Sequence, residues 1–212
     1  YYSLYGSMLV AKERGKFKNF EKSDYYKGKA LYKYYSGDLD VTPKTDKVKE
    51  LLDNIDIYIP TKEDWGWLDK EIHKYGLYNA YQNAVAPNQS SAYIMEVSSS
   101  VQPVSSEVEF RDYGYLQTVY SQALLTNENK HLYKSAYDID QLKYMELMAT
   151  IQEHIDQAIS ITVFINSDTK LKRQLAIIIK AWQKGIKSLY YWRTQKQSIM
   201  ADKEPICESC SV

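Results

Sequence analysis

The clearest hydrophobic pattern lies in the C-terminal third of the chain. Residues 158–165 alternate with the period of two that is typical of a strand, with Ile159, Ile161, Val163 and Ile165 on one face and Ala158, Ser160, Thr162 and Phe164 on the other. Residues 170–184 repeat apolar side chains every three to four positions, which predicts a helix ending at Gly185. The repeating positions are Leu171, Leu175, Ile178 and Trp182. Residues 186–193 then predict a second strand, so the order and lengths indicate a βαβ unit with parallel strands.

The first of these strands has two unlike faces. One face is aliphatic: Ile159, Ile161, Val163 and Ile165. The other carries Ser160 and Thr162, which are small and polar. In a parallel sheet that helices cover on one side, such a face points into a site or a barrel interior, or it meets solvent. The sequence leaves both alternatives open.

Helices are also expected earlier in the chain. Residues 5–13 and 46–55 are two short candidates, and a third begins after Thr61 and ends at Gly76. A longer helix follows Asp138, which is expected to cap it, with Gln141 completing a capping box. Its apolar stripe consists of Leu142, Met145, Met148, Ile151 and Ile155.

The middle of the chain has weaker patterns. Residues 77–86 are expected to lead into a strand that ends at Pro87, and a polar loop over residues 87–91 follows. Residues 92–129 have no sustained period, which predicts irregular structure with one short helix.

Composition narrows the classes of function. The chain has 27 Lys and Arg against 27 Asp and Glu, scattered along its 212 residues, which argues against nucleic acid or a membrane surface as partners. Its apolar runs are too short to span a bilayer, and we expect no secretory signal. Cys207 and Cys210 are the only cysteines, so we expect no disulfide framework and a cytoplasmic location.

Three features could carry chemistry. The loop over residues 87–91 could direct backbone N–H groups at a phosphate, or could simply turn the chain. Cys207 and Cys210 form a Cys-x-x-Cys motif, which is half a zinc site, a redox dithiol or a pair of ordinary thiols; the lack of a second ligand pair argues against zinc. Tyr190-Tyr191 is one of four Tyr-Tyr pairs among 21 tyrosines, so the pair alone indicates nothing.

Longer motifs give these features a context. Four of them occur in the C-terminal half: residues 133–140 (Tyr-Lys-Ser-Ala-Tyr-Asp-Ile-Asp), 153–160 (Glu-His-Ile-Asp-Gln-Ala-Ile-Ser), 184–191 (Lys-Gly-Ile-Lys-Ser-Leu-Tyr-Tyr) and 207–210 (Cys-Glu-Ser-Cys). Together with residues 15–25 and 57–65, they resemble the large subunits of class Ib ribonucleotide reductases. The resemblance implies an α/β fold, the C-terminal portion of a ten-stranded barrel over residues 1–194. A flexible redox tail over residues 195–212 would follow.

The resemblance also implies roles for the three features. The family binds the substrate diphosphate on the loop that here reads Pro87, Asn88, Gln89, Ser90 and Ser91; Asn88 and Gln89 depart from the usual letters. The pair Tyr190-Tyr191 would relay a radical. Cys207 and Cys210 would re-reduce the active-site cysteines after each turnover.

Partners and cofactors follow from the same resemblance. The substrate would be a ribonucleoside diphosphate, reduced with the help of a glutaredoxin- or thioredoxin-like protein. The radical would come from a small subunit with a dinuclear Mn or Fe centre and a tyrosyl radical. The catalytic cysteines and the dNTP or ATP effector sites would lie on an upstream large-subunit fragment, so we expect this chain to be part of a split or longer subunit. The alternative is a non-catalytic binding or thiol-redox module derived from that fold.

Overall fold

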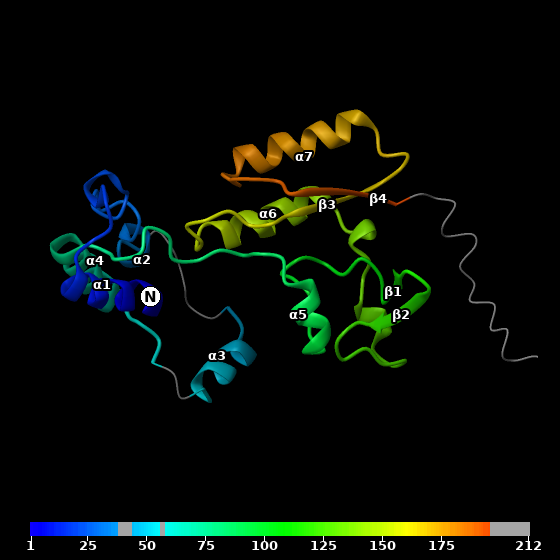
Figure 1. The fold of residues 1–212 in the computed structure, drawn as a ribbon, viewed down its shortest axis with the longest axis horizontal. Helices are drawn as coiled ribbons and strands as arrows, with labels where there is room; N and C mark the ends of the chain where they lie inside the picture. The colour runs from blue at the N-terminus through cyan, green and yellow to red at the C-terminus, as the bar shows by residue number, and fades with distance from the viewer. Residues whose placement is uncertain (38–43, 56–57, 196–212) are drawn as a thin grey trace, which may run out of the picture. The chain divides into compact units, whose positions relative to one another are not determined.

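The chain divides into two compact units, Tyr1–Gln82 and the part that begins at Asn83. The computed structural model describes residues 1–37, 44–55 and 58–195, with backbone only for residues 111–113. The first unit contains α1 (Tyr2–Arg14), the 3-10 helix η1 (Phe20–Lys22), α2 (Tyr32–Tyr35), α3 (Asp46–Asp53) and α4 (Lys62–Tyr75) (Figure 1). The second contains α5 (Gln89–Ile94), β1 (Val108–Tyr113), β2 (Leu116–Ser121), η2 (Lys130–Leu132), η3 (Ala136–Asp138), α6 (Gln141–Gln152), β3 (Thr162–Asn166), α7 (Leu171–Gln183) and β4 (Tyr191–Gln195). The division into residues 1–194 and a tail stays a prediction, and the tail from residue 196 lies outside the described residues.

The first unit is built on the apolar sides of α1 and α4. Its buried core consists of Leu4, Met8, Phe20, Leu31, Leu68, Ile72 and Leu77. The predicted boundaries of α4 are confirmed: Thr61 accepts a hydrogen bond from Asp64 N–H, Asp64 accepts one from Thr61 N–H, and Gly76 follows the last turn. Gly76 has φ +82°, and a Cβ there would lie 2.4 Å from Cβ of Lys16, so a side chain would clash.

α3 confirms the helix expected over residues 46–55, two residues shorter than predicted. Thr45 caps it by accepting a hydrogen bond from Val48 N–H. None of its residues is buried, and Val48 and Leu51 on its apolar side are exposed.

The second unit contains the predicted βαβ arrangement. β3 and β4 pair in parallel, with Thr162 opposite Tyr191 and Phe164 opposite Arg193, and α7 connects them. β4 begins five residues later than expected, because the chain first closes the end of α7, where Ile186 N–H donates to Ala181 O.

Helices α6 and α7 pack against β3 in one hydrophobic core. Its buried members are Tyr144, Met145, Met148, Ile159, Ile161, Val163, Ile177 and Ala181. α7 therefore buries Ile177 and Ala181, while the four positions that predicted the helix, Leu171, Leu175, Ile178 and Trp182, are exposed. The helical period was right, but α7 has apolar side chains around most of its circumference, so spacing alone did not identify the buried side.

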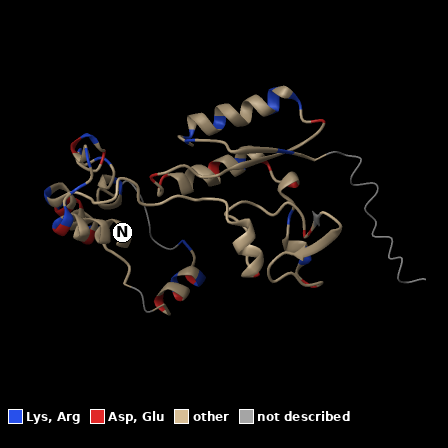
Figure 2. Cartoon of the chain, in the orientation of Figure 1, with Lys and Arg blue, Asp and Glu red and all other residues tan. Residues whose placement is uncertain are grey.

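Polar contacts also fix α6. The predicted cap, Asp138, is wrong: Asp138 ends η3, and Asp140 caps α6 by accepting a hydrogen bond from Leu142 N–H, 2.9 Å. Figure 2 shows Lys and Arg but no Asp or Glu on α7. α6 supplies a partner, because Glu146 lies 2.5 Å from Lys180.

The hairpin formed by β1 and β2 was missed by the sequence analysis. Its register places Tyr113 opposite Leu116, so two residues, Gly114 and Tyr115, form the turn. Gly114 has φ +65°, as the first position of a type II′ turn requires. The hairpin packs on α5 through stacked rings of Tyr93 and Tyr120, 4.2 Å between centroids.

The strand expected over residues 77–86 is reduced to a single parallel bridge between Val85 and Ile159. In residues 1–37, 44–55 and 58–195, the strands form two separate pairs, β1 with β2 and β3 with β4. These pairs do not close a barrel, so the ten-stranded barrel stays a prediction. No helix in these ranges is both long and apolar enough to cross a membrane.

Candidate functional site

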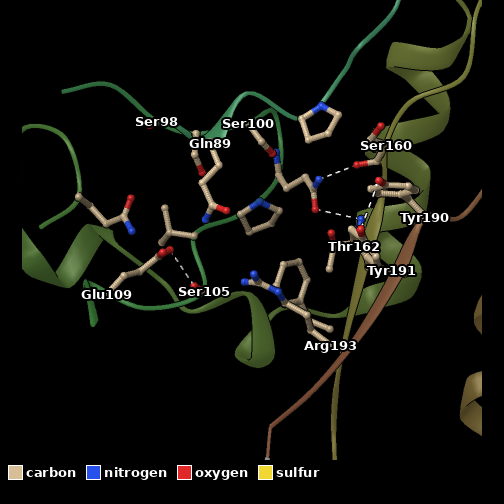
Figure 3. Close-up of a pocket in the computed structure, with 17 residues that line it drawn as sticks. Gln89, Ser98, Ser100, Ser105, Glu109, Ser160, Thr162, Tyr190, Tyr191 and Arg193 are labelled. Atoms are coloured by element: carbon tan, nitrogen blue, oxygen red, sulfur yellow. Dashed lines mark hydrogen bonds between the residues drawn. The ribbon is translucent and has the colours of Figure 1, made fainter. Parts of the chain in front are cut away.

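A cavity of about 130 Å³ opens beside β3 and β4 in the second unit (Figure 3). Most of its lining residues carry hydroxyl or amide groups: Gln89, Ser98, Ser99, Ser100, Gln102, Ser105, Gln122, Ser160, Thr162, Tyr190 and Tyr191. Among the described residues that line it, only Glu109 and Arg193 carry a formal charge. Such a wall can form many hydrogen bonds to a polar ligand and combines them with one positive group.

β3 begins at Thr162, four residues later than predicted, but residues 159–164 direct their two faces as the alternation predicted. Ile161 and Val163 lie in the hydrophobic core. Ser160, Thr162 and Phe164 line the cavity, with Thr162 only 8% exposed. Of the two alternatives that the sequence left open, the polar face therefore points into a pocket.

One edge of β3 faces a side chain in place of a strand. Ser160 N–H donates to Val85 O across 3.0 Å, where the segment that leads to Pro87 runs beside Ile159 and Ser160. That segment then leaves at Pro87. Beyond it, Thr162 N–H donates to Oε1 of Gln102 across 2.9 Å, and Nε2 of Gln102 donates to Ser160 O across 2.6 Å. The edge thus keeps its hydrogen bonds after the neighbouring backbone departs.

A second glutamine continues this pattern. Phe164 N–H donates to Oε1 of Gln141 across 3.0 Å, and Nε2 of Gln141 donates to Ala136 O across 3.0 Å. Gln141 is buried at 7% exposure, so it ties the start of α6 to β3 and η3. The capping-box role expected for Gln141 is therefore wrong.

Tyr190 and Tyr191 lie together at the start of β4. Their ring centroids are 4.0 Å apart, and their hydroxyl groups share a hydrogen bond of 3.2 Å. Both backbone N–H groups donate to Ile161 O, at 2.8 Å and 3.3 Å. The pKa of Tyr190 is raised, first by the hydrogen bond between the two hydroxyl groups, then by electrostatic interaction with Tyr191 and by desolvation.

The polar loop contributes to the same cavity through Pro87 and Gln89, whereas Asn88, Ser90 and Ser91 are not among the lining residues. α5 begins within this loop, at Gln89, and Ala92 N–H is the first to bond back, to Asn88 O. The preceding N–H groups of the first turn have no acceptor within the helix.

A chain of hydrogen bonds joins this loop to the hairpin. Nε2 of Gln89 donates to the Tyr93 hydroxyl across 2.8 Å, and that hydroxyl donates to Glu109 across 2.7 Å. The other oxygen of Glu109 accepts from the Ser105 hydroxyl across 3.0 Å. These contacts fix one side of the cavity.

Arg193 was missed by the sequence analysis. It lies two residues after Tyr191 on β4, and a period of two places alternate residues on one face, so the spacing could have identified it. Its guanidinium group points into the cavity in Figure 3. Burial raises the pKa of Tyr137, and the positive charge of Arg193 partly offsets this rise. Gln102 gave no sequence signal, because its role depends on a contact 60 residues away.

Two remaining expectations concern ligands. Cys207 and Cys210 lie outside the described residues. The part of the chain that the structure describes contains no group of three or more His, Cys, Asp or Glu able to hold a metal ion.

A parallel βαβ unit with a polar cavity beside its strands defines a domain of the α/β class with a candidate ligand site at the sheet. The chain belongs to a particular family of that class. The family described as "Ribonucleotide reductase, barrel domain" matches residues 1–192.

Similar proteins carry the corresponding name. The chain is 39% identical over 214 residues to "Ribonucleoside-diphosphate reductase NrdEB subunit alpha" of Bacillus subtilis, with 100% of this chain and 19% of that protein covered. It is 38% identical to "Ribonucleoside-diphosphate reductase subunit alpha" of the same organism (29% of that protein covered), and 36% identical to the protein of that name from Mycoplasma pneumoniae (30%), again over 100% of this chain. The chain therefore spans 19% to 30% of the length of these curated relatives.

Proposed function

We propose that this chain is the C-terminal part of the large, catalytic subunit of a class Ib ribonucleotide reductase, which reduces ribonucleoside diphosphates to deoxyribonucleoside diphosphates. The observation that carries the proposal is one cavity lined both by Tyr190 and Tyr191 and by Pro87 and Gln89 of the polar loop. Class Ib is supported by the motifs of the sequence and by the similarity to the NrdEB subunit.

The loop and the first turn of α5 are proposed to bind the substrate diphosphate. Backbone N–H groups at the start of a helix attract anions, and this interaction does not depend on the side chains at Asn88 and Gln89. Ser90 and Ser91 provide the N–H groups that precede the first intrahelical bond of α5. Arg193 adds a positive charge to the cavity that Pro87 and Gln89 of this loop line.

Tyr190 and Tyr191 are proposed to transfer a radical. In each step an oxidised tyrosine regains one electron and one proton while its neighbour loses both, so the radical moves by one residue. The contact between the two rings provides a route for the electron, and the hydrogen bond between the hydroxyl groups provides one for the proton. By the order of the family, Tyr191 faces the small subunit and Tyr190 the catalytic cysteine.

The remaining parts of the reaction require other polypeptide. The upstream part of the large subunit is proposed to supply the catalytic cysteines and the nucleotide effector sites, and a small subunit with a dinuclear Mn or Fe centre to supply the radical. Cys207 and Cys210 are proposed to carry electrons from a glutaredoxin- or thioredoxin-like protein to the active-site disulfide by thiol–disulfide exchange.

Reconstitution tests this division of labour. The chain is mixed with an upstream large-subunit fragment, the small subunit and a reductant, and deoxyribonucleoside diphosphate is quantified. We expect turnover with all components and none when the upstream fragment is omitted. Activity from this chain and the small subunit alone, or inactivity of the complete mixture, would contradict the proposal.

A further inference from the structure

The side chain of Gln102 substitutes for a strand beside β3. Its amide donates to Ser160 O and accepts from Thr162 N–H, at 2.6 Å and 2.9 Å. A peptide group of a neighbouring strand offers the same donor and acceptor. Figure 3 shows these two bonds at the wall of the cavity.

Tyr190 and Tyr191 are hydrogen-bonded to the opposite edge of residues 160–162. Ile161 lies between the two residues that Gln102 contacts, and its carbonyl oxygen accepts the N–H groups of Tyr190 and Tyr191. Residues 160–162 are therefore hydrogen-bonded to Gln102 on one edge and to Tyr190 and Tyr191 on the other edge. A shift of that segment moves the carbonyl group that positions both tyrosines.

Gln102 is itself held in place. Its backbone N–H donates to the Ser100 hydroxyl across 2.9 Å. Pro103 follows it and restricts the preceding backbone to extended conformations. The next residue, Val104, accepts a hydrogen bond from Ala136 N–H across 2.8 Å. The segment can thus act as a fixed support.

We propose that Gln102 is a positioning residue, which holds β3 so that Tyr190 and Tyr191 keep their place in the cavity. The proposal rests on the radical-transfer role proposed for the two tyrosines. Gln102 touches neither of the reacting phenol groups and acts through the backbone of residues 160–162.

The first test measures backbone protection in the chain itself, without any enzyme activity. Gln102→Leu removes both hydrogen bonds at similar volume. The matched control is Gln122→Leu, because Gln122 lines the same cavity but donates to Ser106 O, away from β3. Amide hydrogen exchange in Gln102→Leu should be about fivefold faster in peptides containing Thr162 and in peptides containing Tyr190 and Tyr191. Unchanged exchange in the tyrosine peptide would overturn the proposal.

The second test uses the assembled enzyme and the variant Gln102→Glu. A protonated carboxyl group can donate to Ser160 O and accept from Thr162 N–H, whereas a carboxylate can only accept. The carbonyl oxygen of Ser160 therefore raises the pKa of the new side chain. Titratable or charged groups that line the same cavity are Glu109 on β1, Tyr190 directly before β4, and Tyr191 and Arg193 on β4. The control Gln174→Glu makes the same substitution on α7, outside the cavity, at a residue whose side-chain amide donates to Thr169 O.

Turnover by Gln102→Glu, relative to wild type, should therefore rise as the pH falls, while KM for the diphosphate substrate stays within about twofold, since the phosphate loop is unchanged. Gln174→Glu should follow the wild-type profile. A Gln102→Glu profile parallel to wild type at every pH would refute the positioning role. An inactive wild-type assembly would count against the proposed function, and the exchange measurement would still decide the role of Gln102.

Discussion

Tyr190 and Tyr191 share a hydrogen bond although they are neighbours in the chain. In a regular strand consecutive side chains point to opposite faces. Here two successive N–H groups bond to one carbonyl group, that of Ile161, so two residues oppose one as in a β-bulge. This irregularity brings both rings to the same side, where they line the cavity together.

The contact predicts the effect of removing each hydroxyl group. Phe keeps the ring but has no proton to release with the electron, so Tyr190→Phe and Tyr191→Phe should each abolish turnover in the assembled enzyme. Folding, subunit affinity and substrate affinity should stay close to wild type. Turnover is measured beside substrate binding for each variant.

Two other tyrosine pairs provide controls for this experiment. Tyr25 and Tyr34 pack against the core of the first unit, and Tyr25→Phe and Tyr34→Phe should retain most activity. A Tyr191→Phe enzyme that turns over normally would remove the radical path from the proposed function.

The loop at the start of α5 should respond mainly to backbone changes. Ser90→Ala removes at most one hydrogen bond and should weaken diphosphate binding by about 1 kcal/mol. Ser91→Pro removes a backbone donor and forces Ser90 away from helical conformation, so it should weaken binding far more. Calorimetric titration with a ribonucleoside diphosphate measures both; equal affinity of Ser91→Pro and wild type would exclude this loop from the site.

The C-terminal thiols should matter only after the first cycle. Cys207→Ser or Cys210→Ser should block repeated turnover driven by a thioredoxin-like protein, because the dithiol delivers electrons but does not contact the transition state. A single turnover by pre-reduced enzyme should be unaffected. Rapid-quench measurement of product per active site separates the two cases, and loss of the first turnover would contradict the shuttle role.

Gln141 should contribute to stability through the groups it satisfies. Gln141→Leu leaves the Phe164 N–H and Ala136 O without their side-chain partner in a buried setting, which should cost about 2 kcal/mol or more. Gln174→Leu loses one bond, to Thr169 O, at a half-buried position and should cost less. The two variants are compared by urea unfolding, monitored through hydrogen exchange in peptides of the second unit. Equal unfolding midpoints of the two variants would contradict this role of Gln141.

Asp64 predicts a pH dependence of the first unit. Its pKa is lowered by the hydrogen bond from the Tyr58 hydroxyl and then by those from Thr61. The carboxylate therefore stabilises the fold above its unfolded pKa, and this contribution is lost as the pH falls through the lowered folded value. Thermal unfolding should show wild type more stable than Asp64→Asn near neutral pH, with the difference disappearing in acid. A difference independent of pH would exclude the carboxylate as its source.

Local chemistry explains which elements the sequence predicted. Thr61 and Gly76 delimit α4 because a capping hydroxyl and a left-handed residue act within their own helix. The same reasoning failed at Asp138, because two acceptable caps lie two residues apart and the tertiary contacts of Gln141 fix the one at Asp140. The side of α7 that is buried depends on what β3 offers, and the spacing of apolar residues does not contain that information.

The candidate site divides in a similar way. Motifs selected Tyr190, Pro87 and Gln89, and strand alternation selected Thr162, all of which line the cavity; Asn88, Ser90 and Ser91, which the same motif selected, do not. Gln102 could not be identified, because its contact with β3 joins segments 60 residues apart and needs only an amide of the right length. The hairpin of β1 and β2 was within reach, since Gly114 offered the turn residue that its geometry requires.

The side-chain amides along β3 have a consequence for association between chains. An exposed strand edge with free N–H groups is a template for strands of other molecules. On β3 the N–H groups of Thr162 and Phe164 are already bonded to the side chains of Gln102 and Gln141. β3 should therefore resist edge-to-edge aggregation during synthesis and folding, a protection that shortening either amide would weaken.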